Sequence, residues 1–254
     1  MQGRFNADTA ALQVREGLNA ALGARNLEEW IAGCAQPRHG ERVLDIGCGT
    51  GKQIFDLVQR VGGLAVLGID ISEDAVAAVR RRARDGAIAG VEAERIGIDD
   101  CVERLASQVF DLILSTYAIY YASDLGGTVE RLAQLARPGG RAFLSGPGAG
   151  TNRELIAIVR EVAADDAAIG DIDDFIGADR IESARRQWGA VELHRLDNWV
   201  AFPSVEAVLD WWRNHNSYRP ELEDGVASVL ARVVARDGGF HLTKNVLGIL
   251  LKRT

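Results

Sequence analysis

Residues 43–51 (VLDIGCGTG) place three glycines at alternate positions after an acidic residue. The apolar residues before Asp45 predict a buried parallel strand, and a helical pattern begins at Lys52. Glycine is needed where a ligand must approach the main chain more closely than a Cβ allows, or where φ must be positive. The segment therefore predicts a turn whose backbone binds a nucleotide-like ligand.

Two nucleotide-binding patterns do not match this turn. A phosphate-binding P-loop needs G-x-x-x-x-G-K followed by Ser or Thr, but Ile46 occupies the first glycine position and Gln53 the hydroxyl position. A dinucleotide fingerprint needs G-x-G-x-x-G, whereas the spacing here is G-x-G-x-G. An NAD-dependent oxidoreductase is disfavoured by this spacing and stays as an alternative.

The acidic-x-G-x-G-x-G pattern resembles motif I of the class I (Rossmann-like) S-adenosylmethionine-dependent methyltransferases of the small-molecule type. The resemblance covers residues 40–147 and includes the RPGG turn at 137–140. It implies that S-adenosylmethionine is the cofactor, and that the backbone of Gly47 and Gly49 approaches its methionine and ribose portions. Asp45 either contacts the cationic end of this ligand or holds the glycine turn in shape, because a bare buried carboxylate is costly.

Further carboxylates stand at the ends of the second and third predicted strands. Asp70 lies 19 residues after Gly51, and an acid about 20 residues beyond a glycine loop binds ribose hydroxyls in dinucleotide folds. The resemblance implies the same role for Asp70, and Ile71 is assigned to the same site. It also implies that an aspartate of the next loop accepts the adenine amino group; the offset to the Phe-Asp dipeptide at 110–111 favours Asp99 over the adjacent Asp100.

The acceptor side of the site is predicted where the fourth strand ends. The resemblance implies that this strand ends beside the sulfonium, where Ser115 is in position to bind the methionine amino group. Tyr120 and Tyr121 follow, and aromatic faces stabilise a sulfonium by about 0.5–2 kcal/mol. A general base is needed only if the acceptor must lose a proton early; the candidates are these two tyrosines, His215 and His241.

The elements that position these residues form an alternating strand–helix series from residue 42 to 147, which predicts a parallel sheet. The strands are predicted at 42–47, 65–71, 91–98, 110–116 and 141–146, and two further strands at 190–202 and 240–252. The resemblance implies an α/β, doubly wound, seven-stranded and mostly parallel sheet in the order 3-2-1-4-5-7-6, with an antiparallel last strand and helical cap insertions.

Three blocks of sequence are predicted. Residues 1–36 form an N-terminal helical cap, with two helices broken near Gly23, and residues 37–150 form the cofactor-binding core. Residues 151–254 complete the sheet and carry helical lid insertions at 151–188 and 203–238. Capping-box spacing at 151–154 predicts the start of the first lid helix.

Composition narrows the partners. Of the 254 residues, 29 are Lys or Arg and 36 are Asp or Glu, and the net charge of −7 disfavours a nucleic-acid partner. Three cysteines without a C-x-x-C spacing predict neither disulfides nor a metal site, and they favour a cytoplasmic location. No apolar stretch is long enough to span a membrane. The sequence is compatible with a homodimer.

These observations predict a methyltransferase that moves a methyl group from S-adenosylmethionine to a small-molecule acceptor by in-line displacement. Oxygen and nitrogen are the favoured acceptor atoms, and carbon is a third option. One alternative of another class is a methyltransferase-like protein that binds S-adenosylmethionine or a partner without catalysis.

Overall fold

The computed structural model describes residues 14, 17–19, 21–164 and 170–254. Contacts divide the chain into two compact units, each assembled from separate segments. The large unit comprises Glu28–Gly146, Asp174–Arg195 and Leu247–Thr254, and the small unit comprises Met1–Leu27, Pro147–Asp173 and Leu196–Val246. This division cuts across the predicted sequence blocks, because the chain leaves the sheet and returns to it more than once.

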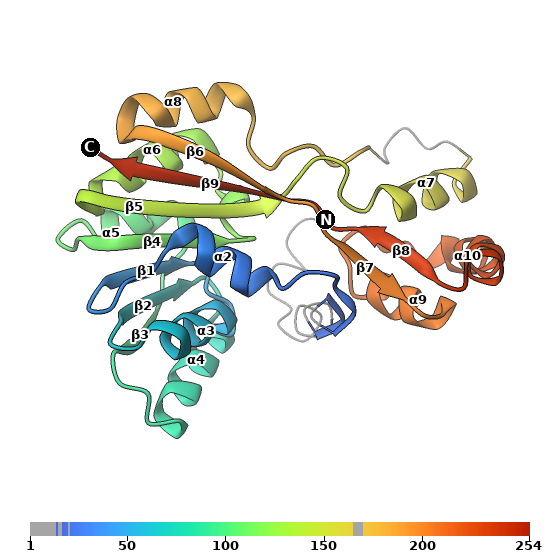
Figure 1. The fold of residues 1–254 in the computed structure, drawn as a ribbon, viewed down its shortest axis with the longest axis horizontal. Coiled ribbons are helices and arrows are strands. Elements are labelled where there is room, and N and C mark those ends of the chain that lie inside the picture. The colour runs from blue at the N-terminus through green and yellow to red at the C-terminus, as the bar shows by residue number, and fades with distance from the viewer. Residues whose placement is uncertain (1–13, 15–16, 20, 165–169) are drawn as a thin grey trace. The chain divides into compact units, whose positions relative to one another are not determined.

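A seven-stranded sheet with the order β3-β2-β1-β4-β5-β9-β6 forms the large unit (Figure 1). Strands β1 to β5 pair in parallel, whereas β9 runs antiparallel to β5, and the predicted fold class is confirmed. The strands are β1 (Arg42–Ile46), β2 (Ala65–Asp70), β3 (Val91–Arg95), β4 (Phe110–Thr116), β5 (Ala136–Pro147), β6 (Gly189–Leu196) and β9 (Val246–Arg253).

The strand order reverses between β1 and β4, and this switch positions the site. Right-handed crossovers place the helices after β1 and β2 on one face of the sheet and those between β4 and β5 on the other. Ligands of such sheets bind beyond the carboxyl ends of the strands at the switch. The helices of this unit are α2 (Leu27–Ala35), α3 (Lys52–Val61), α4 (Glu73–Asp85), α5 (Cys101–Arg104), α6 (Leu125–Arg131) and α8 (Ala178–Trp188).

Local sequence signals account for several of these boundaries. Ser72 caps α4, since its hydroxyl accepts a hydrogen bond from the N–H of Ala75. The apolar residues at 125, 129, 132 and 136 share one helical face and predict a helix as far as residue 136. Helix α6 instead ends at Arg131, and a 3₁₀ turn, η3 (Leu132–Gln134), follows. Strand β5 then begins at Ala136, earlier than predicted, and its pairing with β4 is irregular between Phe110 and Leu112.

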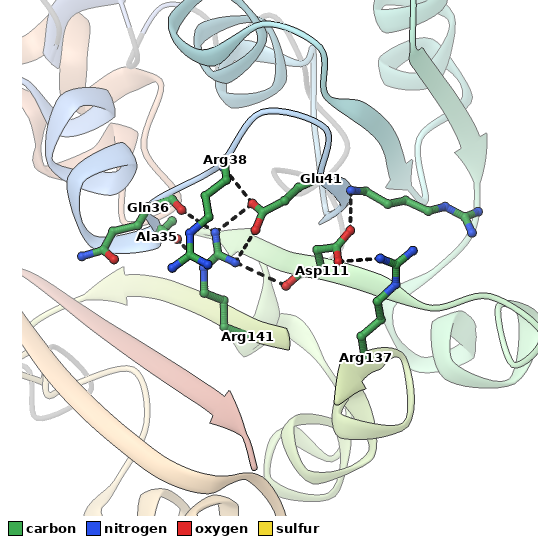
Figure 2. Close-up of polar contacts among 8 residues, drawn as sticks. Ala35, Gln36, Arg38, Glu41, Asp111, Arg137 and Arg141 are labelled. Carbon is green, nitrogen blue, oxygen red and sulfur yellow. Dashed lines mark hydrogen bonds and ion pairs between the residues drawn. The ribbon is translucent and has the colours of Figure 1, made fainter. Parts of the chain in front are cut away.

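A buried arginine ties helix α2 to the amino ends of the strands (Figure 2). Arg141 on β5 donates from Nε to the carbonyl of Ala35 (2.8 Å) and from Nη2 to that of Gln36. Its two Nη atoms also bind the carboxylate of Glu41 at 2.8 and 2.9 Å. The positive charge of Arg141 thus lies at the carboxyl end of α2, where it interacts favourably with the partial negative charge of the helix dipole.

The small unit is built on a two-stranded antiparallel sheet of β7 (Trp199–Phe202) and β8 (Phe240–Thr243). Helices α7 (Arg153–Val162), α9 (Val205–Arg213) and α10 (Glu223–Asp237) belong to the same unit. One core joins these elements; its largest side chains are Trp211, Trp212 and Phe202.

Two predicted strands are corrected by this sheet. The stretch 190–202 is two strands, β6 and β7, in different sheets, and 240–252 is likewise divided into β8 and β9. The first break falls at Asn198, whose side chain accepts from the N–H groups of Trp199 and Arg25 (2.9 and 3.0 Å). Such local side-chain hydrogen bonds compete with a strand ladder.

The lid predictions are also revised. Helix α7 begins without the predicted capping box, because Asn152 adopts a left-handed conformation (φ 61°) and Glu154 instead accepts from the N–H and hydroxyl of Thr243. Helix α8 belongs to the large unit, where the indole N–H of Trp188 donates to the carbonyl of Val129 in α6 (2.9 Å). Much of the first predicted N-terminal helix lies outside the described residues.

Candidate active site

The glycine turn follows β1 directly and is anchored to β2. The N–H groups of Gly47 and Cys48 both donate to the carbonyl of Ile69, at 2.8 and 3.0 Å. Gly47 has φ 71° and packs so closely that a Cβ would lie 2.2 Å from the Cβ of Ala118. Gly49 also has a positive φ of 53°. The turn therefore requires glycine, for the reason that the sequence suggested.

Asp70 lies at the end of β2 with its carboxylate against this turn. Oδ2 accepts from the N–H of Gly49 and Oδ1 from the N–H of Ser72, both at 2.9 Å. These bonds fix the orientation of the carboxylate and leave further lone pairs on both oxygens. Ile71 is 64% exposed, so an apolar surface lies next to the carboxylate. A sugar diol can donate hydrogen bonds to such a carboxylate, and a flat base can pack on such an apolar side chain.

Asp45 lies below the turn and is 1% exposed. Among the described residues, neither of its carboxylate oxygens has a hydrogen-bond partner. Burial, and then the negative charge of Asp70, raise the pKa of Asp45 to about 7. A buried carboxylate without a partner is costly, so the site is prepared for a cationic or hydrogen-bond-donating group.

The two predicted adenine-binding acids lie in a short 3₁₀ turn, η1 (Ile98–Asp100), and both are exposed. Oδ1 of Asp99 accepts from the N–H of Ser123 (2.9 Å). This bond connects the loop after β3 with the loop after β4. This hydrogen bond orients the side chain of Asp99. Asp100 is the next residue in the same 3₁₀ turn, and the choice between the two as the adenine-binding acid stays a prediction.

Ser115 is fully buried in β4, and its hydroxyl donates to the carbonyl of Ile46 (2.9 Å). The side chain therefore joins the ends of β4 and β1 directly below the glycine turn. This contact gives Ser115 a structural task, and its binding of a methionine amino group stays a prediction.

The turn after β4 carries the predicted tyrosines and is held at several points. Tyr117 has a positive φ of 57°, and its N–H donates to the carbonyl of Ser145 (2.8 Å). Burial raises the pKa of Tyr117, so its phenol stays protonated and is unsuited as a base. Tyr120 and Tyr121 follow in the 3₁₀ turn η2 (Ile119–Tyr121), with ring centroids 4.6 Å apart, and Tyr121 is 48% exposed.

His215 lies in the small unit, after helix α9. Its ring stacks on Trp211 at a centroid distance of 4.8 Å, and Nδ1 lies 2.7 Å from the hydroxyl of Ser217. The other candidate histidine, His241, is exposed on β8. The sequence-predicted site residues of the large unit are thus brought together, whereas both histidines belong to the other unit.

Sequence reasoning missed the ring of Phe175. Its centroid lies 6.1 Å from that of Tyr120, and a Cβ on Gly146 would lie 2.8 Å from its Cγ. Phe175 stands in an aspartate-rich stretch, part of which (165–169) lies outside the described residues. This stretch does not fit a calcium loop, because Phe175 and Ile176 fall where that loop needs a ligand and its glycine. An aromatic residue directly after two aspartates was the available signal in the sequence.

The arrangement fits S-adenosylmethionine. The unpartnered carboxylate of Asp45 suits a cationic group, the glycine turn accepts a close ligand, and Asp70 with Ile71 suits a nucleoside.

Within the described part of the chain, no group of three or more His, Cys, Asp or Glu side chains is placed to hold a metal ion. Across the same residues, no helix has the length and apolar character needed to cross a bilayer. Fold and site together define a Rossmann-like class of nucleoside-binding proteins.

A family described as a methyltransferase domain matches residues 37–192. The chain belongs to this family, and it is an S-adenosylmethionine-dependent methyltransferase. It is 32% identical over 198 residues to nocamycin O-methyltransferase of Saccharothrix syringae, covering 70% of each protein. It is also 31% identical over 114 residues to aklanonic acid methyltransferase DauC of Streptomyces sp. (strain C5), covering 44% of this chain and 51% of that protein.

Solved structures share the fold. One is a Haemonchus contortus phosphoethanolamine N-methyltransferase 2 in complex with phosphomonomethylethanolamine and S-adenosylhomocysteine. It superposes with a TM-score of 0.59 at 17% identity, covering 98% of this chain and 57% of that one. At this identity the likeness concerns the fold alone.

Proposed function

We propose that this enzyme transfers the methyl group of S-adenosylmethionine to a hydroxyl oxygen of a small-molecule acceptor. One observation carries the proposal: the turn with Tyr120 and Tyr121 is packed on the glycine turn through Ala118 and Gly47, and bonded to Asp99 through Ser123. Any acceptor bound at these tyrosines lies beside the cofactor residues of the same unit.

Each cofactor residue has a task in this proposal. The carboxylate of Asp70 accepts hydrogen bonds from the ribose hydroxyls, and Ile71 packs on the adenine ring, whose amino group Asp99 or Asp100 binds. Asp45 balances the cationic methionine end from below. Hydrogen bonds to a charged group contribute about 1.5–3 kcal/mol each.

The remaining work of the protein is to position the acceptor. S-adenosylmethionine, when bound, supplies a methyl group already activated by its sulfonium. Holding the acceptor oxygen in line with this group converts a bimolecular reaction into an effectively unimolecular one. The rings of Tyr120 and Tyr121 exclude water and orient the acceptor. An acidic hydroxyl, such as a phenol or enol, releases its proton to water without a strong protein base, and the resulting oxyanion forms the bond to the methyl carbon as the carbon–sulfur bond breaks. The phenol groups of Tyr120 and Tyr121 can donate hydrogen bonds to this acceptor oxygen.

The choice of oxygen over nitrogen is supported by the relative named as an O-methyltransferase, which is matched over 70% of its length. His215 stays a candidate base. The small unit supplies an aromatic group around it, but the proposed reaction does not depend on this residue.

The test uses S-adenosylmethionine with a deuterated methyl group and a panel of phenols, enols, aliphatic alcohols and amines. We expect mass spectrometry to find the label on oxygen for at least one phenol or enol, and the variant Tyr120→Phe to change the rate. Label found only on nitrogen or carbon would contradict the proposal. Tight binding of S-adenosylmethionine without any product would favour the non-catalytic alternative.

A further inference from the structure

We infer that Phe175 is a specificity-determining residue that selects planar aromatic acceptors, and that the ion pair Arg195–Asp174 positions it. This inference rests on the proposed function for the location of the acceptor. The residues involved belong to the large unit.

Three aromatic rings gather at the carboxyl ends of β4 and β5. Tyr120 is the central ring, with Tyr121 at a centroid distance of 4.6 Å and an interplanar angle of 52°, and Phe175 at 6.1 Å and 56°. Phe175 and Tyr120 are half-buried and Tyr121 is exposed. Aromatic rings favour offset or edge contacts with another ring at such distances. The group therefore presents ring surface to a flat ligand.

Gly146 at the end of β5 makes the position of Phe175 possible. A Cβ there would lie 2.8 Å from Cγ of Phe175 and 3.0 Å from Cδ1 of Tyr120. Both rings thus occupy the space that any larger residue would fill. Phe175 itself packs against the core of the large unit, and the next residue, Ile176, is buried in that core.

The preceding residue is held by a two-pronged ion pair. Nη1 and Nη2 of Arg195 on β6 bind Oδ1 and Oδ2 of Asp174 at 3.0 and 2.7 Å. Such fork-to-fork contacts fix geometry as well as charge. The side chain of Arg195 is 54% exposed, and exposed pairs add little to stability. The pair therefore affects where Phe175 lies much more than whether the protein folds.

The experiment measures binding of 1-naphthol and of its saturated counterpart decahydro-1-naphthol by calorimetry, with the enzyme saturated in S-adenosylhomocysteine. The wild type is expected to prefer 1-naphthol. Phe175→Leu is expected to weaken 1-naphthol binding about five- to tenfold, the value of an aromatic contact beyond its buried area. Affinity for S-adenosylmethionine is expected to stay within about twofold of the wild-type value.

Arg195→Gln is expected to cause a smaller loss of 1-naphthol affinity, and the reversed pair Arg195→Asp with Asp174→Arg to restore it. The control is Glu192→Gln, on the same strand as Arg195. It removes the ion pair of Glu192 with Lys252 of β9 and is expected to leave the binding of both probes unchanged. Equal binding of the two probes by the wild type, or an unaltered preference in Phe175→Leu, would overturn the inference.

The two proposals fail separately. Loss of 1-naphthol binding in Phe175→Leu, in an enzyme that methylates no hydroxyl, would leave the aromatic site standing and remove the proposed reaction. If the enzyme methylates a hydroxyl but Phe175→Leu changes the binding of neither probe, the proposed reaction stands and the role of Phe175 is removed.

Discussion

Asp45 shows most clearly, among single residues, how the site depends on its ligand. Its carboxylate is buried beside Asp70 and has no hydrogen-bond partner among the described residues. Its pKa of about 7 lies above the value near 3.9 of an unfolded chain. The native state therefore binds a proton that the unfolded state releases, and the ligand-free protein should lose stability as the pH rises from about 4 to about 7.

The variant Asp45→Asn removes this dependence. At pH 8 and without S-adenosylmethionine, we expect it to unfold at a higher temperature than the wild type, with a gain of up to about 4 kcal/mol from about 1.4 kcal/mol for each pKa unit. At pH 4 the two proteins should be alike. Thermal unfolding across this pH range measures the effect, and parallel stability curves would contradict it. The same variant should bind S-adenosylmethionine more weakly.

Asp70 should act on ligand binding and also on this pH dependence, because its negative charge is the second cause of the raised pKa of Asp45. Asp70→Asn keeps one oxygen for the N–H of Gly49 or Ser72 but loses the charge that favours ribose hydroxyls. We expect the affinity for S-adenosylmethionine to fall about 10- to 100-fold, since hydrogen bonds to charged groups contribute 1.5–3 kcal/mol. Calorimetry provides the measurement, with Asp85→Asn in the exposed last turn of α4 as the matched control. Unchanged affinity would mean that ribose binds elsewhere.

At the level of elements, the turn between β1 and α3 depends on close packing and not on glycine flexibility alone. Gly47 and Gly40 both have positive φ, 71° and 82°, but a Cβ on Gly40 meets nothing within 4 Å. Gly40→Ala therefore measures backbone strain, about 1 kcal/mol or somewhat more.

Gly47→Ala should cost more, about 2–4 kcal/mol, because its Cβ would overlap Ala118. It should also weaken S-adenosylmethionine binding, which Gly40→Ala should leave intact. Chemical denaturation and calorimetry on the two variants separate strain from packing. Equal losses in both would show that the contact with Ala118 has no special role.

The amino ends of the strands offer a contrasting element, because their ion pairs stabilise the fold without touching the site. Arg141→Met would leave the carboxylate of Glu41, 12% exposed, without its cation and with only the N–H of Arg38 as a hydrogen-bond donor, and should cost about 3–5 kcal/mol. Arg137→Met removes an exposed pair with Asp111 and should cost about 1 kcal/mol at most (Figure 2). Urea denaturation gives both values. Cofactor affinity should be unchanged in the folded fraction of either variant.

At the scale of the whole molecule, the features that could be predicted are those that short stretches of sequence determine. The turn at residues 43–51 and the carboxylate of Asp70 follow from short spacings. The alternating pattern predicted a parallel sheet, and the family resemblance implied the strand order that is observed. A strand pattern does not reveal where two adjacent strands enter different sheets, and the break at Asn198 depends on a contact with Arg25, 173 residues away in sequence.

Phe175 could not be assigned for the same kind of reason. Its position depends on Gly146 and on the pairing of Asp174 with Arg195, which only the folded chain brings together. The proposed cofactor residues thus come from sequence motifs, whereas the proposed acceptor side comes from contacts between segments that are distant in sequence. The residues that select the acceptor are accordingly recognised from the tertiary structure and not from a sequence motif.

The most direct measurement is a crystal structure of the enzyme with S-adenosylhomocysteine. We expect both ribose hydroxyls within hydrogen-bond distance of the carboxylate of Asp70, the adenine ring on Ile71, and the sulfur facing Tyr120 and Tyr121. A ligand whose ribose does not touch Asp70, or whose sulfur points away from these tyrosines, would contradict the central claim that one edge of this sheet holds both the methyl donor and its acceptor.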